Sequence, residues 1–268
     1  MGPLALLLIL AVVQGLTEFL PVSSSGHLVL ARALLPGGDR LPADATVEVL
    51  LHLGTLLAVL AFYRREVLAL AAGVCGRGAD VGAQRRLFGL LVLGTLPAGI
   101  VGLGFAGLIE GSFAHPAFSA AALLVTGALL FWSRRLPVAG RPLADLAVRA
   151  ALVIGVAQAF AILPGISRSG ATIVAGLAVG LSLPAAATFS FLLSIPAIAG
   201  ASLLKASDFS LAAVGGVGAM LAAVAASAVV GFAALGLLVR IGKTRRLWWF
   251  APYCWLAGAT ALLVLAAR

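Results

Sequence analysis

The chain has 268 residues, of which 62% are hydrophobic and only 10% are charged, and its mean hydropathy is +1.16. It carries 18 Lys and Arg residues against 9 Asp and Glu residues, for a formal net charge of +9. Several apolar runs approach the roughly 20 residues that a helix needs to cross a bilayer, which argues against a soluble domain. We therefore predict one polytopic α-helical membrane domain over residues 1–268, in contact with membrane lipids. The basic residues gather in short loops between apolar runs, so we interpret them as topology determinants and expect no nucleic acid partner.

In chain order, the first half is expected to hold one broken hairpin and three spans. Short apolar runs at 4–13 and 28–35 flank a polar stretch in which Pro21 and Gly26 are expected to break a regular helix. This pattern predicts a re-entrant helical hairpin, because irregular backbone at membrane depth must be buried in protein or line a wet cavity. Transmembrane helices are expected at 47–63, 87–109 and 117–133.

The pattern then restarts near residue 145. Apolar runs at 150–163 and 173–181 flank a second polar stretch, and further spans are expected at 187–204, 211–239 and 248–266. Since three spans is an odd number, the second unit should be inverted relative to the first. The sequence thus predicts an all-α polytopic membrane protein of two inverted-topology repeats, about 1–135 and 145–268. Each repeat would be a re-entrant helical hairpin plus three transmembrane helices.

Arginine and lysine residues cluster in three of the connecting loops. These loops span 64–86, 134–149 and 240–247, and by the positive-inside rule they should face the cytoplasm. Both chain ends should then face the opposite side, the periplasm.

The two polar stretches are related by a shift of 144 positions. The first reads QGLTEFLPVSSSGH (14–27) and the second QAFAILPGISRSGAT (158–172), so that Ser23 falls on Ser167 and Ser25 on Ser169. An unpaired polar group in an apolar medium costs roughly 2–7 kcal/mol. Polar clusters inside such apolar surroundings therefore predict a functional site.

The second stretch has the composition of an anion site. Arg168 stands between Ser167 and Ser169, with Thr172 a turn later. A guanidinium can grip a phosphate through two parallel hydrogen bonds, and the backbone N–H groups of a following helix can add to this. The hydroxyl groups are also explained by capping of broken helix ends. Capping does not explain an arginine at membrane depth, so an anion site is the favoured interpretation.

The first stretch adds a carboxylate and an amide on one helix face. Gln14 and Glu18 are four residues apart, and a carboxylate beside a phosphate site indicates a divalent cation with oxygen ligands. Glu48, which shares a helix face with His52, is a further candidate ligand.

The same stretch also offers candidates for the chemical step. His27 can act as a general acid or base, or it can be a neutral, hydrogen-bonded interior histidine. Ser23, Ser24 and Ser25 provide a nucleophile or hydrogen-bond donors to phosphate. The nucleophile remains open at this point between Ser24, His27 and a water molecule.

Together with VEVLLHLGTLLAVLAFYRR (47–65) and FSFLLSIPAIAGA (189–201), the two motifs resemble the undecaprenyl-diphosphate phosphatase family of the bacitracin-resistance type. The resemblance covers most of the chain. It implies an enzyme of the bacterial inner membrane that hydrolyses the C55 isoprenyl diphosphate to undecaprenyl phosphate and inorganic phosphate, recycling the lipid carrier of cell-wall synthesis. It also implies an active site facing the periplasm and a divalent cation, Mg²⁺ or Ca²⁺.

Carried over by motif, Glu18 would be the acidic residue and metal ligand, Ser24 the nucleophile, His27 its partner and Arg168 the phosphate-binding cation. The residues expected to bind substrate are Gln14, Ser23, Ser25, Ser167, Ser169 and Thr172. The family's first acidic position is Gln14 here, which gives a metal one charge fewer and shifts weight to Glu18. The alternative function, from architecture alone, is a lipid flippase or secondary transporter. A homo-oligomer is compatible with either.

Overall fold

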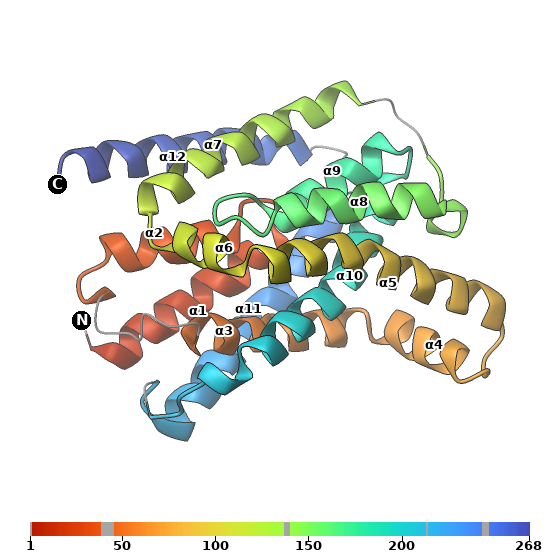
Figure 1. The fold of residues 1–268 in the computed structure, drawn as a ribbon, viewed down its shortest axis with the longest axis horizontal. Helices are drawn as coiled ribbons and strands as arrows, with labels where there is room; N and C mark the ends of the chain where they lie inside the picture. The colour runs from red at the N-terminus through yellow and green to blue at the C-terminus, as the bar shows by residue number, and fades with distance from the viewer. Residues whose placement is uncertain (1, 39–45, 137–139, 213, 243–246) are drawn as a thin grey trace.

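The computed structural model describes residues 2–38, 46–136, 140–212, 214–242 and 247–268. Within these residues the chain is helical and forms twelve α-helices. Figure 1 shows them as an elongated bundle with both chain ends at its left end and the α4–α5 connection at its right end.

The first half of the chain contains seven of the described α-helices, namely α1 (Pro3–Phe19), α2 (Ser24–Leu34), α3 (Thr46–Phe62), α4 (Arg64–Val74), α5 (Val81–Gly104), α6 (Ala106–Phe113) and α7 (Pro116–Trp132). The second half contains α8 (Val148–Phe160), α9 (Arg168–Ala178), α10 (Leu183–Leu204), α11 (Gly216–Gly242) and α12 (Ala251–Ala266). Short 3₁₀ turns are found at η2 (Ser133–Arg135), η3 (Leu143–Asp145), η4 (Ala206–Asp208) and η5 (Leu247–Phe250).

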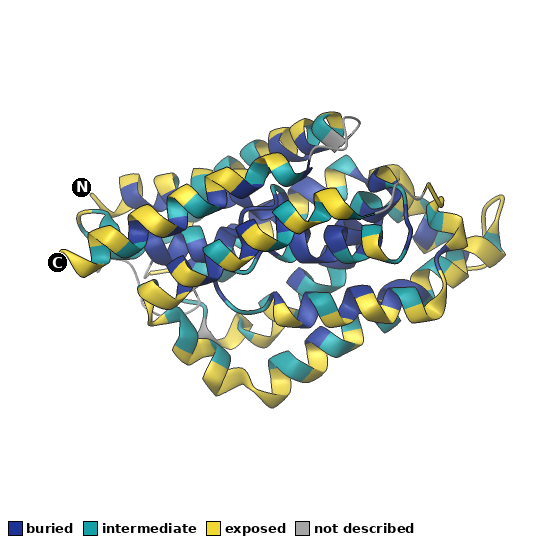
Figure 2. Cartoon of the chain, turned by 90° about the horizontal axis from the view of Figure 1, so that it is seen from above, coloured by how far each residue is buried: buried dark blue, intermediate teal, exposed yellow. Residues whose placement is uncertain are grey.

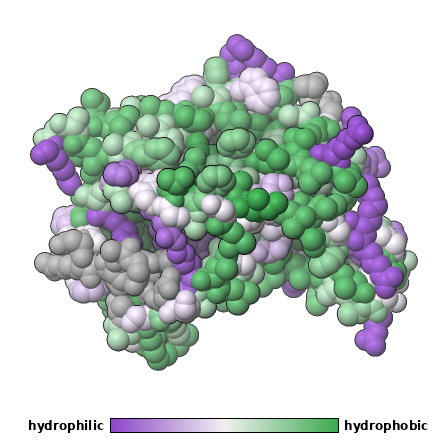
Figure 3. All heavy atoms as spheres, viewed as in Figure 1, coloured by the Kyte–Doolittle hydropathy of each residue, from purple (hydrophilic) through white to green (hydrophobic). Residues whose placement is uncertain are grey.

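Five stretches of the described chain are long and apolar enough to cross a membrane. They correspond to α5, α7, α10, α11 and α12, and the pair α3 and α4 passes the same test together but is bent by 81° at Tyr63. Figure 2 shows buried residues along the interior of the bundle and exposed residues on its outer faces. In Figure 3 apolar side chains cover the middle of the visible face, while hydrophilic side chains gather at its right-hand end. The chain is therefore a multi-pass membrane protein, as predicted.

The structure differs from the sequence prediction in two loops. The segment 64–86 was expected to be a loop but contains α4 and the start of α5, and the connection 110–116 between the expected spans 87–109 and 117–133 overlaps α6. In α4 the buried residues Leu70 and Gly73 face α5, so a helix forms despite its three charged residues. The arginines therefore mark the end of the bundle without excluding helical structure there.

The prediction that Gly26 breaks a helix was also wrong. Gly26 and its repeat counterpart Gly170 lie within the first turn of α2 and α9, and their N–H groups donate to the N-cap serines three residues earlier, Ser23 and Ser167. The actual break after α1 lies at residues 20–23, where Pro21 has no N–H and Ser23 has a φ of +69°. Helix α1 consequently continues through Gln14 and Glu18 and is longer than the apolar run 4–13.

Close helix packing fixes the two broken hairpins in the bundle. Helix α1 packs mainly against α11, and α8 mainly against α5. Glycines permit both contacts: a Cβ on Gly15 would lie 2.8 Å from the Ser227 carbonyl oxygen, and one on Gly155 would lie 2.4 Å from the Gly94 carbonyl oxygen. Because real Cβ atoms do not approach backbone so closely, both helix pairs need glycine at these positions.

Candidate functional site

The connections of the two hairpins, residues 20–23 and 161–167, meet inside the bundle. The Oγ of Ser23 accepts hydrogen bonds from the N–H of Gly26 at 3.3 Å and from the N–H of Gly165 at 3.1 Å. A Cβ on Gly26 would lie only 2.7 Å from the Cα of Gly165, and Gly165 itself has a φ of +99°. The backbones of segments 142 residues apart thus touch directly.

The serines that the internal repeat aligns make equivalent contacts. Ser23 caps α2, and Ser167 caps α9 by accepting from the N–H of Gly170 at 3.0 Å. The Oγ of each capping serine also lies within hydrogen-bond distance of the Oγ two residues later. The distance is 3.4 Å from Ser23 to Ser25 and 3.2 Å from Ser167 to Ser169. These four serines therefore hold the polar connections together.

The carboxylate of Glu18 is the centre of the polar cluster. The residue is only 5% exposed, and its Oε2 accepts hydrogen bonds from Gln14 Nε2 at 3.0 Å and from Ser24 Oγ at 2.5 Å. Its Oε1 forms an ion pair with the guanidinium of Arg168. The Nε2 of His52 lies 3.6 Å from Oε2. One buried carboxylate therefore joins residues from α1, α2, α3 and α9.

Ser24 and Arg168 occupy the same position in their helices, the first residue of α2 and of α9. The N-terminus of a helix presents free backbone N–H groups and favours negative charge. The Arg168 side chain keeps 19% of its surface exposed, whereas Glu18 keeps 3%. The cluster thus presents a cation, a hydroxyl and two helix N-termini around one carboxylate, which suits binding of a phosphate group.

His27 is turned toward another helix. Its Nδ1 lies 2.7 Å from the carbonyl oxygen of Ser23, and its Nε2 lies 2.8 Å from the Oη of Tyr253 on α12. In the described chain the ring makes no hydrogen bond with Ser24, whose Oγ bonds to Glu18. The structure therefore places His27 beside the cluster, one turn after Ser24, with Tyr253 as its side-chain partner.

The remaining predicted residues lie around this centre. Thr172 donates to the carbonyl oxygen of Arg168 at 2.8 Å and lies 2.5 Å from the hydroxyl of Ser190, so it supports the first turn of α9. Glu48 is half-buried on α3 and interacts electrostatically with His52, Arg32 and Lys205.

Three residues of the site were not predicted. His52 approaches Glu18, and the only sequence signal was its position one turn after Glu48. The hydroxyl of Thr126 donates to the Gly165 carbonyl at 2.7 Å and accepts from the Ser167 N–H at 3.0 Å, which fixes the second connection. Thr126 and Tyr253 stand in ordinary apolar helices, so no local pattern marked them.

The donor set fits a divalent cation that is shared with a substrate. In the described part of the chain no group of three or more His, Cys, Asp or Glu side chains is close enough to hold a metal alone. The Oε1 of Gln14, however, is buried and has no hydrogen-bond partner, and it belongs to the side chain that bonds Glu18. Magnesium is commonly held by one or two carboxylates together with substrate phosphates and water. Glu18 would supply the carboxylate, and Oε1 of Gln14 would supply a further oxygen ligand.

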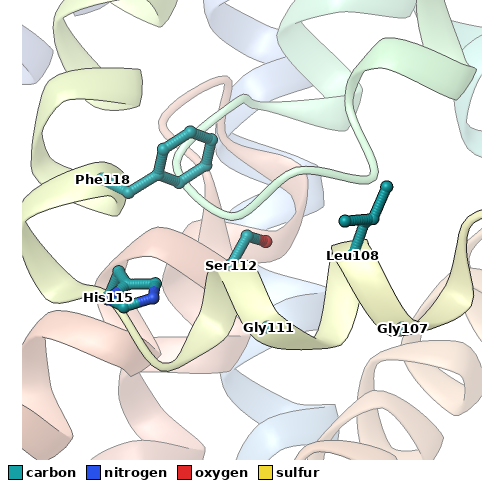
Figure 4. Close-up of a pocket in the computed structure, with 6 residues that line it drawn as sticks. All are labelled: Gly107, Leu108, Gly111, Ser112, His115 and Phe118. Atoms are coloured by element: carbon teal, nitrogen blue, oxygen red, sulfur yellow. The ribbon is translucent and has the colours of Figure 1, made fainter.

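A separate pocket of about 480 Å³ lies at the corner between α6 and α7. Figure 4 shows Leu108 and Ser112 of α6 and Phe118 of α7 around it. None of its lining residues belongs to either polar motif, so we do not assign the chemistry to it.

The fold and the site together define a multi-pass helical membrane protein with a buried polar cluster that suits a phosphate group. Comparison with known proteins gives the family: residues 7–260 match the model described as bacitracin resistance protein BacA, and the chain belongs to this family. A protein of Desulfatibacillum aliphaticivorans named undecaprenyl-diphosphatase is 45% identical, with 95% of this chain and 96% of the relative covered. Proteins with the same name from Syntrophotalea carbinolica (44% identical, 94% and 95% covered) and Rhodopirellula baltica (40% identical, 98% and 99% covered) are also similar.

Proposed function

We infer that the protein is an integral membrane undecaprenyl-diphosphate phosphatase. It hydrolyses the C55 isoprenyl diphosphate to undecaprenyl phosphate and inorganic phosphate, and so recycles the lipid carrier for cell-wall synthesis. Family membership and the shared name of full-length relatives support this activity. The structural observation that carries it is the contact of Ser24 and Arg168 with one buried carboxylate, Glu18.

The geometry supports Ser24 as the nucleophile. Its Oγ would attack the terminal phosphorus while its proton passes to the Glu18 carboxylate, to which it already donates at 2.5 Å. The bond between the terminal phosphorus and the bridging oxygen then breaks, and undecaprenyl phosphate leaves. In the second step water attacks the phosphoserine and the bond between phosphorus and Ser24 Oγ breaks. Glu18 returns its proton to Ser24 Oγ, and His27, one turn further along α2, accepts the proton that the attacking water loses, so inorganic phosphate leaves.

Arg168 provides the main charge for binding the diphosphate. In the absence of substrate the guanidinium is paired with Glu18. This ion pair keeps the positive charge of Arg168 close to the nucleophile. When the diphosphate enters, the five N–H donors of the guanidinium allow it to bind phosphate oxygens. The N-termini of α2 and α9 add backbone donors where negative charge develops. The four serines contribute chiefly by keeping these two helix ends together.

We propose that Glu18 and the Oε1 of Gln14 hold a divalent cation, Mg²⁺ or Ca²⁺, when the diphosphate is bound. The ion would neutralise charge on the phosphate oxygens. Glu48 is the weaker candidate ligand, because Arg32 and Lys205 already act electrostatically on its carboxylate.

We also propose that the two broken hairpins are re-entrant and belong to inverted repeats of a single domain. Figure 1 supports this, since α1 and α2 extend from the left end of the bundle to its middle, whereas α8 and α9 extend from the right. The bounds of α2 and α9 also differ by the same 144 positions as the sequence motifs. Since the α4–α5 connection, which carries Arg77, lies opposite the chain ends in Figure 1, the hairpin α1–α2 opens to the periplasm in a bacterial inner membrane. A homo-oligomer remains a prediction.

Phosphate release from a prenyl diphosphate by the purified full-length protein tests the activity. We expect release with the wild type, loss on addition of EDTA, and loss in Ser24→Ala. Ser25→Ala is the comparison variant and should lose far less activity than Ser24→Ala, because its hydroxyl contacts Ser23 and not Glu18. Absence of release, combined with movement of labelled lipid across the bilayer of liposomes containing the protein, would favour a flippase instead.

A further inference from the structure

The hydrogen bond between His27 and Tyr253 joins the candidate site to the last helix of the chain. The two residues are 226 positions apart, their rings are nearly parallel at 6°, and the ring centroids are 5.6 Å apart. Nothing in the sequence relates α12 to the polar motifs. The contact is therefore a property of the fold.

The partners of His27 determine which nitrogen carries its hydrogen. A carbonyl oxygen can only accept, so the contact at 2.7 Å with the Ser23 carbonyl requires hydrogen on Nδ1. In the neutral ring Nε2 then has a lone pair, and it is placed 2.8 Å from the Tyr253 hydroxyl, which can donate. Nε2 is thus the only nitrogen of His27 that can take up a proton, and Tyr253 covers it.

The start of α12 is fixed on both sides, so this contact is not an accident of a loose side chain. Cys254 is buried and its thiol lies 3.9 Å from the carbonyl oxygen of Pro21, in the first polar connection. The indole N–H of Trp255 donates to the Leu124 carbonyl on α7 at 3.1 Å. Tyr253 immediately precedes these two anchors in the sequence and is 47% exposed. The contacts of Cys254 and Trp255 hold the backbone beside Tyr253, and the Tyr253 ring lies against His27.

We propose that Tyr253 is a positioning residue of the phosphatase reaction: its hydroxyl donates to Nε2 and fixes the orientation of His27, whose tautomer the Ser23 carbonyl sets. This inference rests on the proposed function for its catalytic meaning. Under this proposal α12 is part of the active site. The Tyr253 hydroxyl is then the group nearest to a proton that leaves Nε2 of His27.

Tyr253→Phe tests the proposal because it removes the hydroxyl and keeps the ring. We expect kcat for farnesyl diphosphate, a shorter prenyl diphosphate, to fall about three- to tenfold, the factor that one neutral hydrogen bond is worth. KM should change less than about twofold, because Tyr253 contacts His27 and not the phosphate site. Tyr63→Phe is the matched control: the Tyr63 hydroxyl also forms a side-chain hydrogen bond, with Thr188, and its ring packs against Phe62 and Phe191. It should leave kcat within about twofold.

A double-mutant cycle separates positioning from a structural role. In a His27→Ala background, Tyr253→Phe should cause no further loss of kcat, because the residue it positions is absent. Additive losses would overturn the proposal, and so would an unchanged kcat in Tyr253→Phe.

A spectroscopic measurement decides the same point without any catalysis. In full-length protein with ¹⁵N-labelled histidine, the signals that disappear in His27→Ala belong to His27. They should show the neutral ring with hydrogen on Nδ1, and the Nε2 signal should shift in Tyr253→Phe but not in Tyr63→Phe. An unshifted signal, or hydrogen on Nε2, would refute the pairing. If this signal behaves as expected in a protein that releases no phosphate, then the proposed function fails and the pairing stands.

Discussion

Replacing Gly26 by alanine tests whether direct backbone contact between the two polar connections maintains the site. The added Cβ would lie 2.7 Å from the Cα of Gly165 and 3.0 Å from its nitrogen. Non-bonded carbon atoms prefer about 3.5–4.0 Å, so the connections must separate by roughly 1 Å. Overpacking of this kind costs about 1–3 kcal/mol. The free energy of unfolding should fall by that amount.

The effect on activity should be larger than the effect on stability. Separation of the connections stretches the 3.1 Å bond from Gly165 to Ser23 and moves the start of α2 away from the start of α9. Ser24 and Arg168 stand at those two positions, and a misplacement of about 1 Å can cost on the order of 100-fold in rate. We expect phosphate release to fall at least about tenfold in Gly26→Ala.

Thermal unfolding in detergent and phosphate release from farnesyl diphosphate measure the two effects. Gly89→Ala in α5 is the control, because a Cβ there meets nothing within 4 Å, and it should retain stability and activity. If Gly26→Ala matched Gly89→Ala in both measurements, then the close contact of the connections would not be what holds the site together.

The other predictions concern charge, nucleophile and topology. Arg168→Lys should lower kcat/KM at least about tenfold, since charge-assisted bonds contribute roughly 1.5–3 kcal/mol and lysine lacks the planar fork; wild-type kinetics would exclude the phosphate-binding role. Glu18→Gln should weaken the dependence on divalent cation, and excess cation should partly restore activity, as a titration with Mg²⁺ would show. Ser24→Ala should abolish turnover with bound substrate retained, and near-normal turnover would exclude a phosphoserine. Cys75, which is exposed at the end of α4, should react with a membrane-impermeant maleimide only after cells are permeabilised, whereas buried Cys254 should remain unlabelled in the folded protein.

The helical spans were predictable because apolar length is a local property of the sequence. The runs 47–63 and 117–133 differ from α3 and α7 by one residue at each end. Helices α4 and α6 are too short to be predicted from apolar length. Helix α4 forms because it packs against α5, with Leu70 and Gly73 buried. A reading based on charge alone therefore assigned these segments to loops.

The polar centre of the site could be predicted for a similar reason. Glu18, Ser24 and Arg168 are expensive at membrane depth, so their presence in two aligned motifs implied that they meet. Tyr253 and Thr126 could not be found in this way, because one polar atom on an otherwise apolar helix resembles an ordinary interface or packing residue. Their roles arise from contacts over 226 and 39 positions, which only the packing of α12 and α7 creates.

The internal repeat builds one site and not two because the halves differ at the positions that carry chemistry. The shift of 144 places Ser24 on Arg168, and both reach the same carboxylate. It places Glu18 on Ile162, so the second polar motif (158–172) has no carboxylate of its own. Gln158, which corresponds to Gln14, is consequently buried with neither polar side-chain atom hydrogen-bonded. The duplicated serine caps bring two helix N-termini together, and the single carboxylate then places the cation of one half beside the hydroxyl of the other. A phosphate bound there would contact both halves at once, and neither half alone contains the residues to hydrolyse it.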